Sequence, residues 1–123
     1  MIGYVTLGTN DITRAAAFYD ALLAELGATR WMESERFVAW STSPDGAALS
    51  VIIPFDGNPA SVGNGVMVAL AVPSRDKVDA VYAKALELGG TDEGAPGERF
   101  EGFYAGYFRD LDGNKLNVFC MGG

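Results

Sequence analysis

Histidine is absent from this chain of 123 residues. The side chain that most often acts as a general base near neutral pH is therefore missing, and so is the commonest metal ligand of proteins. The absence also excludes nucleophiles that depend on a Ser-His or a Cys-His pair. Any chemistry that this chain performs must use other groups.

Cysteine occurs once, at Cys120, so the chain cannot form an internal disulfide bond. This usage fits a reducing compartment. No apolar stretch has the length of a membrane span, and the first ten residues lack the basic and apolar regions of a secretion signal. These features predict a cytoplasmic protein in which Cys120 is a buried, inert thiol.

Basic residues are few: nine Lys and Arg stand against sixteen Asp and Glu, which gives a net charge of −7. An acidic chain with scattered cations is a poor candidate for binding nucleic acid or an anionic membrane surface. We therefore expect neither as a partner. Apolar residues make up 49% of the sequence, which is enough to build a folded core.

The first half of the chain is typical of a strand, a helix and further strands. Residues 2–8 alternate between two faces, and a helix is expected from Ile12, capped by Asn10 or Asp11 and ended by Gly27. The remaining segments are expected to be strands at 29–32, 36–42 and 48–53, followed by a polar linker.

The same order then starts again. Residues 66–72 are expected to form a strand, Pro73-Ser74 leads into a second amphipathic helix, and Gly89-Gly90 ends it. Residues 91–102 are expected to be mostly turn and loop, with room for one short strand. A strand–helix–strands unit therefore occurs twice.

Residues 103–120 are expected to form a hairpin that turns at Asp112-Gly113. Alternation places Lys115, Asn117 and Phe119 on one face of its second strand. The sequence thus predicts an α+β fold in one domain over 1–123. Its parts are a first module of about 1–54, a linker at 55–65 and a second module of about 66–123. The two helices would cover the outer sheet face, and the inner faces would form a cup.

Three stretches give this chain a family resemblance: YVTLGTNDITRAAAFYDALLAELG, GNGVMVALAVPSRDKVDAVYAKALELGG and FYAGYFRDLDGNKLNVFC. They resemble the vicinal oxygen chelate superfamily, which includes glyoxalase I, bleomycin-resistance proteins, fosfomycin-resistance enzymes and extradiol dioxygenases. The last stretch is close to the superfamily's Asp-Pro-Asp-Gly-Asn turn, with Leu111 in place of the proline. The resemblance implies two βαβββ modules that form a curved, cup-shaped mixed sheet, and it implies a homodimer.

The superfamily's metal site takes one ligand from each of four strands, usually His, Glu, His and Glu. The resemblance places Tyr4, Ser50, Met67 and Asn117 at these positions. Tyr, Ser, Met and Asn supply neither the imidazole or thiolate that Zn²⁺ prefers nor the carboxylates that Mg²⁺ prefers. We therefore expect no metal and no other cofactor.

The cup is expected to be lined by residues that point inward by alternation. Fosfomycin-resistance relatives place a substrate-contacting tyrosine three residues before the turn, where this chain has Tyr107. The expected ligand-binding residues are Tyr4, Thr6, Trp40, Ser50, Met67, Tyr107, Asn117 and Phe119. Such a lining carries aromatic rings and neutral hydrogen-bonding groups but no fixed charge. It favours a neutral or cationic ligand over an anion.

The sequence allows three functions. The first is a dimeric, metal-free protein that holds a small, partly aromatic, neutral or cationic molecule, as bleomycin-binding relatives do. The second is a lyase or isomerase that resembles glyoxalase, with Tyr4, Tyr107 and Asn117 as candidate catalytic residues that bind a developing oxyanion. The third is a structural dimer without a ligand. Whether the chain is an enzyme stays open at this point.

Overall fold

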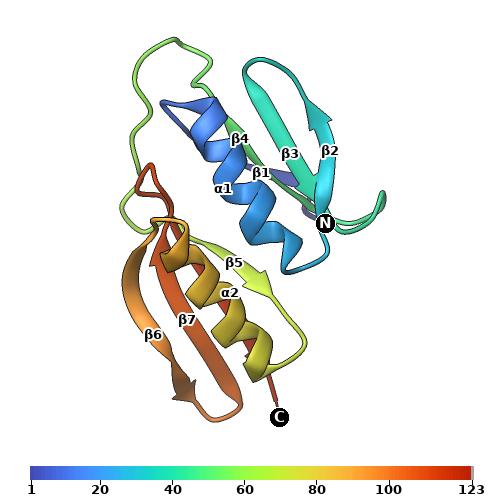
Figure 1. Cartoon of the computed structure of the whole chain (residues 1–123), viewed down its shortest axis with the longest axis vertical. Helices are drawn as coiled ribbons and strands as arrows, with labels where there is room; N and C mark the ends of the chain where they lie inside the picture. The colour runs from blue at the N-terminus through green and yellow to red at the C-terminus, as the bar shows by residue number, and fades with distance from the viewer. Residues whose placement is uncertain (123) are drawn as a thin grey trace. The chain divides into compact units, whose positions relative to one another are not determined.

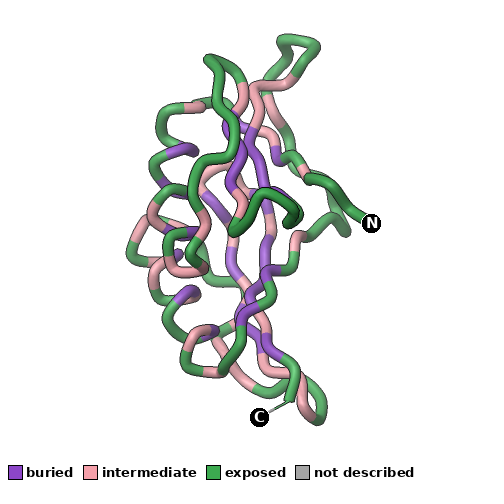
Figure 2. Tube along the Cα trace, turned by 90° about the vertical axis from the view of Figure 1, so that its right-hand side faces the viewer, coloured by how far each residue is buried: buried purple, intermediate pink, exposed green. Residues whose placement is uncertain are grey.

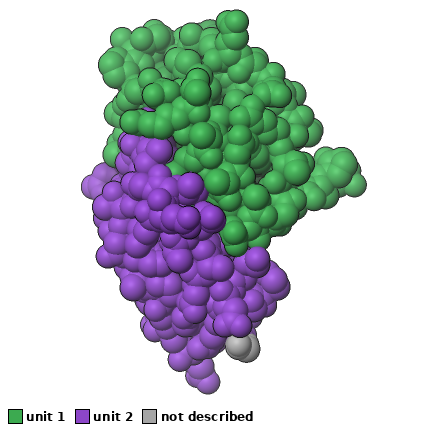
Figure 3. Space-filling model, in the orientation of Figure 1, with its two compact units in different colours: residues 1–62 green, residues 63–123 purple. Residues whose placement is uncertain are grey.

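The computed structural model describes residues 1–122, which divide into two compact units, residues 1–62 and residues 63–122 (Figure 3). Each unit contains four strands and one helix (Figure 1). The elements of the first unit are β1 (Tyr4–Gly8), α1 (Ile12–Ala24), β2 (Thr29–Glu33), β3 (Phe37–Ser41) and β4 (Ala48–Ile52). Those of the second are β5 (Val68–Ala71), α2 (Arg75–Glu87), β6 (Thr91–Phe100), β7 (Phe103–Arg109) and β8 (Lys115–Met121).

The first sheet has the strand order β1-β4-β3-β2. Strands β1 and β4 are parallel, whereas β4 with β3 and β3 with β2 are antiparallel. Helix α1 begins where the Asp11 carboxylate accepts a hydrogen bond from the backbone N–H of Arg14, at 3.0 Å. Its buried residues recur every three or four positions, and they include Tyr19 and Leu22. The apolar side of α1 therefore packs on one face of this sheet (Figure 2).

The second sheet repeats this arrangement in the order β5-β8-β7-β6. Helix α2 is capped by Ser74 and buries Val78, Val81 and Ala85. The register repeats as well: Thr6 pairs with Ser50 in the first sheet and Ala69 pairs with Asn117 in the second. The predicted α+β fold of two βαβββ modules is confirmed. In each unit we call the sheet face that the helix covers the helix face, and the opposite one the far face.

Strand β6 differs from the sequence-based expectation. Residues 91–102 were expected to be mostly loop, but Thr91–Phe100 forms a strand along β7. The register shifts three times along this pair, and Gly94 lies between two of the shifts with a φ of +152°. Because β6 is an edge strand, its glycines and Pro96 are tolerated without loss of the sheet. The turn residues that suggested a loop are the irregular positions of a bulged strand.

The connection between β7 and β8 is held by one buried carboxylate. Asp110 is 4% exposed and accepts hydrogen bonds from the backbone N–H groups of Asp112 and Asn114, both at 2.9 Å. Its second oxygen accepts from the Asn114 side chain at 3.0 Å. Gly113 adopts a φ of +90°. The Asp-Leu-Asp-Gly-Asn motif thus serves to fix this turn and the pairing that follows it.

Gly106 sets the distance between helix α2 and the second sheet. A Cβ atom at this position would lie 3.1 Å from Pro96 Cγ and 3.2 Å from Tyr82 Cδ1. The absence of a side chain therefore allows the Tyr82 ring to lie directly on β7. None of the helices formed by residues 1–122 is long and apolar enough to cross a membrane.

Candidate functional site

In the first unit, the predicted site residues Tyr4 and Thr6 lie on the far face of the sheet. They pair with Ala48 and Ser50. The Tyr4 side chain is 57% exposed, and its ring lies 6.3 Å from Phe37 and 6.5 Å from Trp31, measured between ring centroids. These rings form a small aromatic cluster that remains largely open to solvent.

Ser50 is fully buried on the same far face. Its hydroxyl donates a hydrogen bond to the backbone carbonyl of Val5 at 2.7 Å. This hydrogen bond therefore links β4 to β1 within the first sheet. A structural role accounts for the buried hydroxyl at this position.

Trp40 does not share the far face, so the expectation that it lines the site needs correction. It is 1% exposed, and its ring lies 5.6 Å from that of Tyr19 on α1. The indole N–H donates to the Asp20 carboxylate at 2.8 Å. Alternation along β3 places Trp40 on the helix face, where a large ring fills the core beneath α1.

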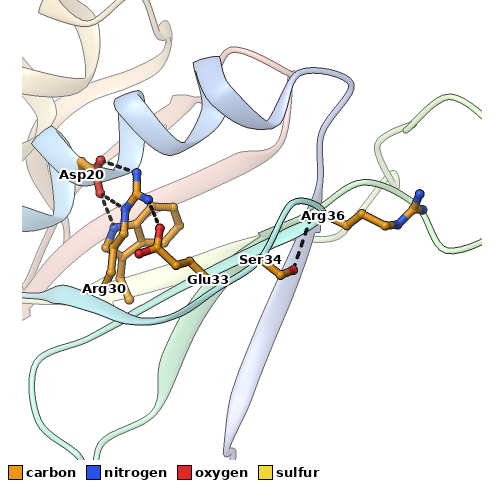
Figure 4. A network of polar contacts seen from close by, with 6 residues as sticks. Asp20, Arg30, Glu33, Ser34 and Arg36 are labelled. Atoms are coloured by element: carbon orange, nitrogen blue, oxygen red, sulfur yellow. Dashed lines mark hydrogen bonds and ion pairs between the residues drawn. The ribbon is translucent and has the colours of Figure 1, made fainter.

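The Asp20 carboxylate also binds Arg30, which in turn binds Glu33 (Figure 4). The hydrogen bonds from Arg30, and to a lesser extent that from Trp40, lower the pKa of Asp20 against an opposing effect of burial. A recess of about 420 Å³ lies beside this network and is lined by Arg30, Glu33 and residues of α1. Because the charges of the network are paired with each other, it serves to attach α1 to β2 and β3.

In the second unit, the predicted site residues Tyr107, Asn117 and Phe119 come together on the far face. Tyr107 pairs directly with Asn117, and Asn117 pairs on its other side with Ala69. Asn117 is only 2% exposed, and its side-chain oxygen Oδ1 has no hydrogen-bond partner among residues 1–122. Buried polar atoms are nearly always partnered, so an orphaned acceptor of this kind needs an explanation.

Phe119 lies next to Asn117 on this face, two residues further along β8. Its ring stacks on Phe103 with 5.3 Å between centroids, and Phe103 stacks on Phe100 with 4.6 Å between centroids. Phe100 at the end of the row is 60% exposed. Three aromatic rings thus continue the far face beyond the amide of Asn117.

The expectation of a lining without fixed charge is wrong for this face. The Arg99 guanidinium lies over the Tyr107 ring at 5.3 Å, and the Lys115 ammonium lies over the same ring at 5.6 Å. Alternation along β8 already grouped Lys115 with Asn117, so that signal was present in the sequence. Arg99 was missed because it belongs to β6, which was expected to be a loop.

Met67 lies just before β5 and contributes to a recess at the cationic end of this face. The recess has a volume of about 320 Å³ and is lined by residues 63–67 together with Arg109 and Lys115. Arg109 is already paired with Glu93 at 3.2 Å and donates to the Gly113 carbonyl at 2.8 Å. Met67 itself is 40% exposed. The predicted residues Met67, Tyr107, Asn117 and Phe119 are therefore all part of the second unit.

A family model described as the glyoxalase/bleomycin resistance protein/dioxygenase superfamily matches residues 1–118. The chain belongs to this superfamily. A crystal structure of a glyoxalase/bleomycin resistance protein from Albidiferax ferrireducens T118 is 35% identical, covers 98% of both chains and has a TM-score of 0.89. A hypothetical protein from S. aureus is 25% identical, with a TM-score of 0.75 and coverage of 98% of this chain and 92% of the other.

A putative glyoxalase from Bacillus halodurans has the same fold, with a TM-score of 0.80 at 22% identity and coverage of 98% of this chain and 95% of the other. None of the curated proteins matches the sequence. The comparisons thus establish the superfamily and its fold.

The residues that the resemblance assigns to the superfamily's metal positions do not suit a metal ion. Ser50 donates its hydroxyl proton to the backbone, and Met67 and Asn117 offer a thioether and a neutral amide. Among residues 1–122, no three His, Cys, Asp or Glu side chains are grouped so that they could hold a metal. Divalent ions bind such neutral donors poorly. No step that needs a metal is therefore assigned to this superfamily member.

Proposed function

We propose that this member of the superfamily binds a small, partly aromatic organic molecule on the far face of its second sheet, without a metal. The observation that carries the proposal is the orphaned Oδ1 of Asn117. An N–H or O–H group of a ligand would satisfy this buried acceptor. The aromatic rings of Phe119 and Phe103 provide apolar surface beside it.

The charges on this face change the expected ligand. A cationic molecule, which the sequence allowed, fits poorly because Arg99 and Lys115 lie over the Tyr107 ring. Like charges that close to a binding site oppose binding by several kcal/mol at most, and by less where solvent screens them. We therefore propose a ligand that is partly aromatic and not cationic.

Binding is favoured over the alternative of a lyase or isomerase. Stabilisation of a developing oxyanion requires hydrogen-bond donors that point at it. The unsatisfied atom of Asn117 is an acceptor.

We also propose that the chain forms a homodimer. Aromatic side chains on the far face of the first sheet are exposed, with Tyr4 at 57% and Trp31 at 50%. Both sheets have edge strands without a neighbour among the described residues. Exposed apolar surface and unpaired strand edges are features that oligomerisation covers.

The ligand site is tested with benzoylglycinamide, an uncharged probe that carries an aromatic ring and N–H donors. We expect it to shift backbone amide signals of β5, β7 and β8 in nuclear magnetic resonance titrations of the labelled full chain. The Phe119→Leu variant should weaken this binding roughly tenfold, because a stacked ring is lost. Phe37→Leu is the matched control, since Phe37 lies on the far face of the first sheet.

The proposal fails if aromatic probes shift no signals of β5, β7 or β8, or if Phe37→Leu weakens binding and Phe119→Leu does not. Added Zn²⁺, Ni²⁺ or Mn²⁺ should leave both the probe affinity and the melting temperature unchanged. A metal-dependent gain in affinity would contradict the metal-free part of the proposal.

A further inference from the structure

On the far face of the second sheet, the chemical character of the side chains changes along the strands. Side chains on one face of a strand follow each other at about 7 Å. Along β8 these side chains are the cationic Lys115, the amide of Asn117 and the ring of Phe119. The partner strand β7 places Arg109, Tyr107 and Ala105 opposite them. Charge, hydrogen-bonding groups and aromatic surface therefore follow one another in a fixed order.

The cationic end holds two charges without a carboxylate partner. Within residues 1–122, neither Arg99 nor Lys115 forms an ion pair, and Arg99 donates only to the backbone carbonyl of Ala95 at 2.5 Å. Other arginines of this unit are neutralised: Arg75 pairs with Glu98 and Arg109 with Glu93. In a chain of net charge −7, two unpaired cations over one tyrosine indicate a place for an external anion.

The backbone of β6 makes room for one of these cations. A Cβ atom at Gly97 would lie 2.9 Å from Arg99 Nη1, and one at Gly94 would lie 3.3 Å from Arg99 Nη2. A side chain at Gly97 would force the guanidinium to move, and one at Gly94 would crowd it. The bulged, glycine-containing strand thus holds a cation beside the hydrogen-bonding pair of Tyr107 and Asn117.

We propose that the ligand is an aromatic carboxylate that carries an N–H or O–H donor between its ring and its carboxylate. This inference rests on the proposed binding function and names the ligand class. The ring stacks beside Phe119, the donor satisfies Asn117 Oδ1, and the carboxylate lies toward Lys115 and Arg99. Lys115 and Phe119 are four residues apart, about 13 Å along the strand, and the flexible lysine side chain shortens the span.

A matched set of four probes tests each part of the proposal by calorimetry and magnetic resonance on the full chain. Benzoylglycine has the ring, the N–H donor and the carboxylate. Benzoylglycinamide lacks the charge, N-methylbenzoylglycine lacks the N–H donor, and acetylglycine lacks the ring. We expect benzoylglycine to bind roughly tenfold more tightly than each of the other three, and its affinity to fall as salt is added.

Lys115→Gln should weaken the binding of benzoylglycine roughly tenfold and leave the affinity for benzoylglycinamide unchanged, because only the charged probe interacts with the ammonium group. Lys84→Gln is the control: it removes the same charge from α2, where Lys84 pairs with Glu87. Arg99→Gln should act like Lys115→Gln. Melting temperatures of all three variants verify that they fold.

The outcomes separate the two proposals. The inference of a carboxylate ligand is wrong if benzoylglycinamide binds as tightly as benzoylglycine. It is also wrong if Lys84→Gln and Lys115→Gln change the affinity for benzoylglycine equally. In both cases the proposed binding of an aromatic molecule still stands. If N-methylbenzoylglycine binds as tightly as benzoylglycine, the role of Asn117 is overturned. If no aromatic probe shifts the signals of β5, β7 or β8, both proposals fail together.

Discussion

Two buried polar residues, Ser50 and Asn117, occupy equivalent positions in the two sheets and differ in how they are satisfied. The Ser50 hydroxyl donates to the Val5 carbonyl at 2.7 Å, whereas Oδ1 of Asn117 has no partner in the described part of the chain. A satisfied buried group supports the fold, but an orphaned one destabilises it. We infer that Asn117 serves to bind a ligand, whereas Ser50 stabilises the sheet.

Substitutions at Asn117 and Ser50 should change stability in opposite directions. Asn117→Val should raise the free energy of unfolding by about 1 kcal/mol, because it removes an unsatisfied polar group at a strand position that suits a branched side chain. The same substitution should abolish binding of benzoylglycine. Urea unfolding and calorimetry measure the two effects.

Ser50→Ala is the matched counterpart and should lower the free energy of unfolding by about 1 kcal/mol, since the Val5 carbonyl loses its hydroxyl donor. It should leave the affinity for benzoylglycine unchanged. A loss of stability in Asn117→Val similar to that in Ser50→Ala would show that the asparagine is a structural residue.

At the scale of elements, each helix is attached to its sheet by a different device. Helix α2 depends on close approach at Gly106, where the Tyr82 ring and Pro96 fill the space of the missing side chain. Helix α1 is held by the ionic network of Asp20, Arg30 and Glu33 together with the indole of Trp40. The two βαβββ modules therefore share a topology but differ in what joins helix to strand.

Gly106→Ala should lower the free energy of unfolding by about 1–2 kcal/mol, because the added methyl group collides with Tyr82 and Pro96. The restriction of the unfolded chain that alanine brings works in the opposite direction and is smaller. Gly3→Ala provides the control, since a Cβ atom there would meet no other described residue within 4 Å apart from its chain neighbours. Equal stability of Gly106→Ala and the native chain in urea unfolding would contradict the packing argument.

The Asp20 network predicts a pH dependence of stability. The hydrogen bonds from Arg30 hold the pKa of Asp20 below its usual value of 3.8 in the folded chain. Its contribution is therefore complete above that pH and is lost as the pH falls through the lower, folded-state pKa. The stability difference between the native chain and Asp20→Asn should shrink toward acid, as urea unfolding between neutral and acidic pH measures.

In an Arg30→Gln background, Asp20→Asn should lose most of its dependence on pH, because the main cause of the lowered pKa is gone. The remaining hydrogen bond that lowers this pKa comes from Trp40, which donates to Asp20 at 2.8 Å in the native chain. A stability difference that is the same at all pH values in the native background would show that the ion pair contributes nothing measurable, as many exposed pairs do.

For the whole molecule, we predict a homodimer. Light scattering at micromolar concentration should give about twice the 13.0 kDa mass of the chain. The expected cause is the exposed aromatic surface of the first sheet, around Tyr4 and Trp31, together with the unpaired strand edges. A mass of one chain across the micromolar range would refute the prediction.

The amino-acid sequence by itself determined the elements and their repetition. Apolar periodicity and capping residues are local signals, so both helices begin where Asp11 and Ser74 predict them. Alternation also grouped Lys115, Asn117 and Phe119 on one face of β8, because the two-residue period of a strand needs no tertiary information. These signals were sufficient to predict the α+β fold and the residues that β8 contributes to the candidate site.

The tertiary structure decided the chemistry of that site. The bulged pairing of β6 with β7 brings Arg99 over Tyr107, and no local pattern predicts such a register. The missing partner of Asn117 Oδ1 is likewise a property of the packed chain, since it depends on every neighbour at once. Trp40 belongs to the core because α1 covers its face of β3, where its indole N–H donates to Asp20. Charge, burial and hydrogen bonding at a site depend on contacts between residues far apart in sequence, and only the folded chain specifies them.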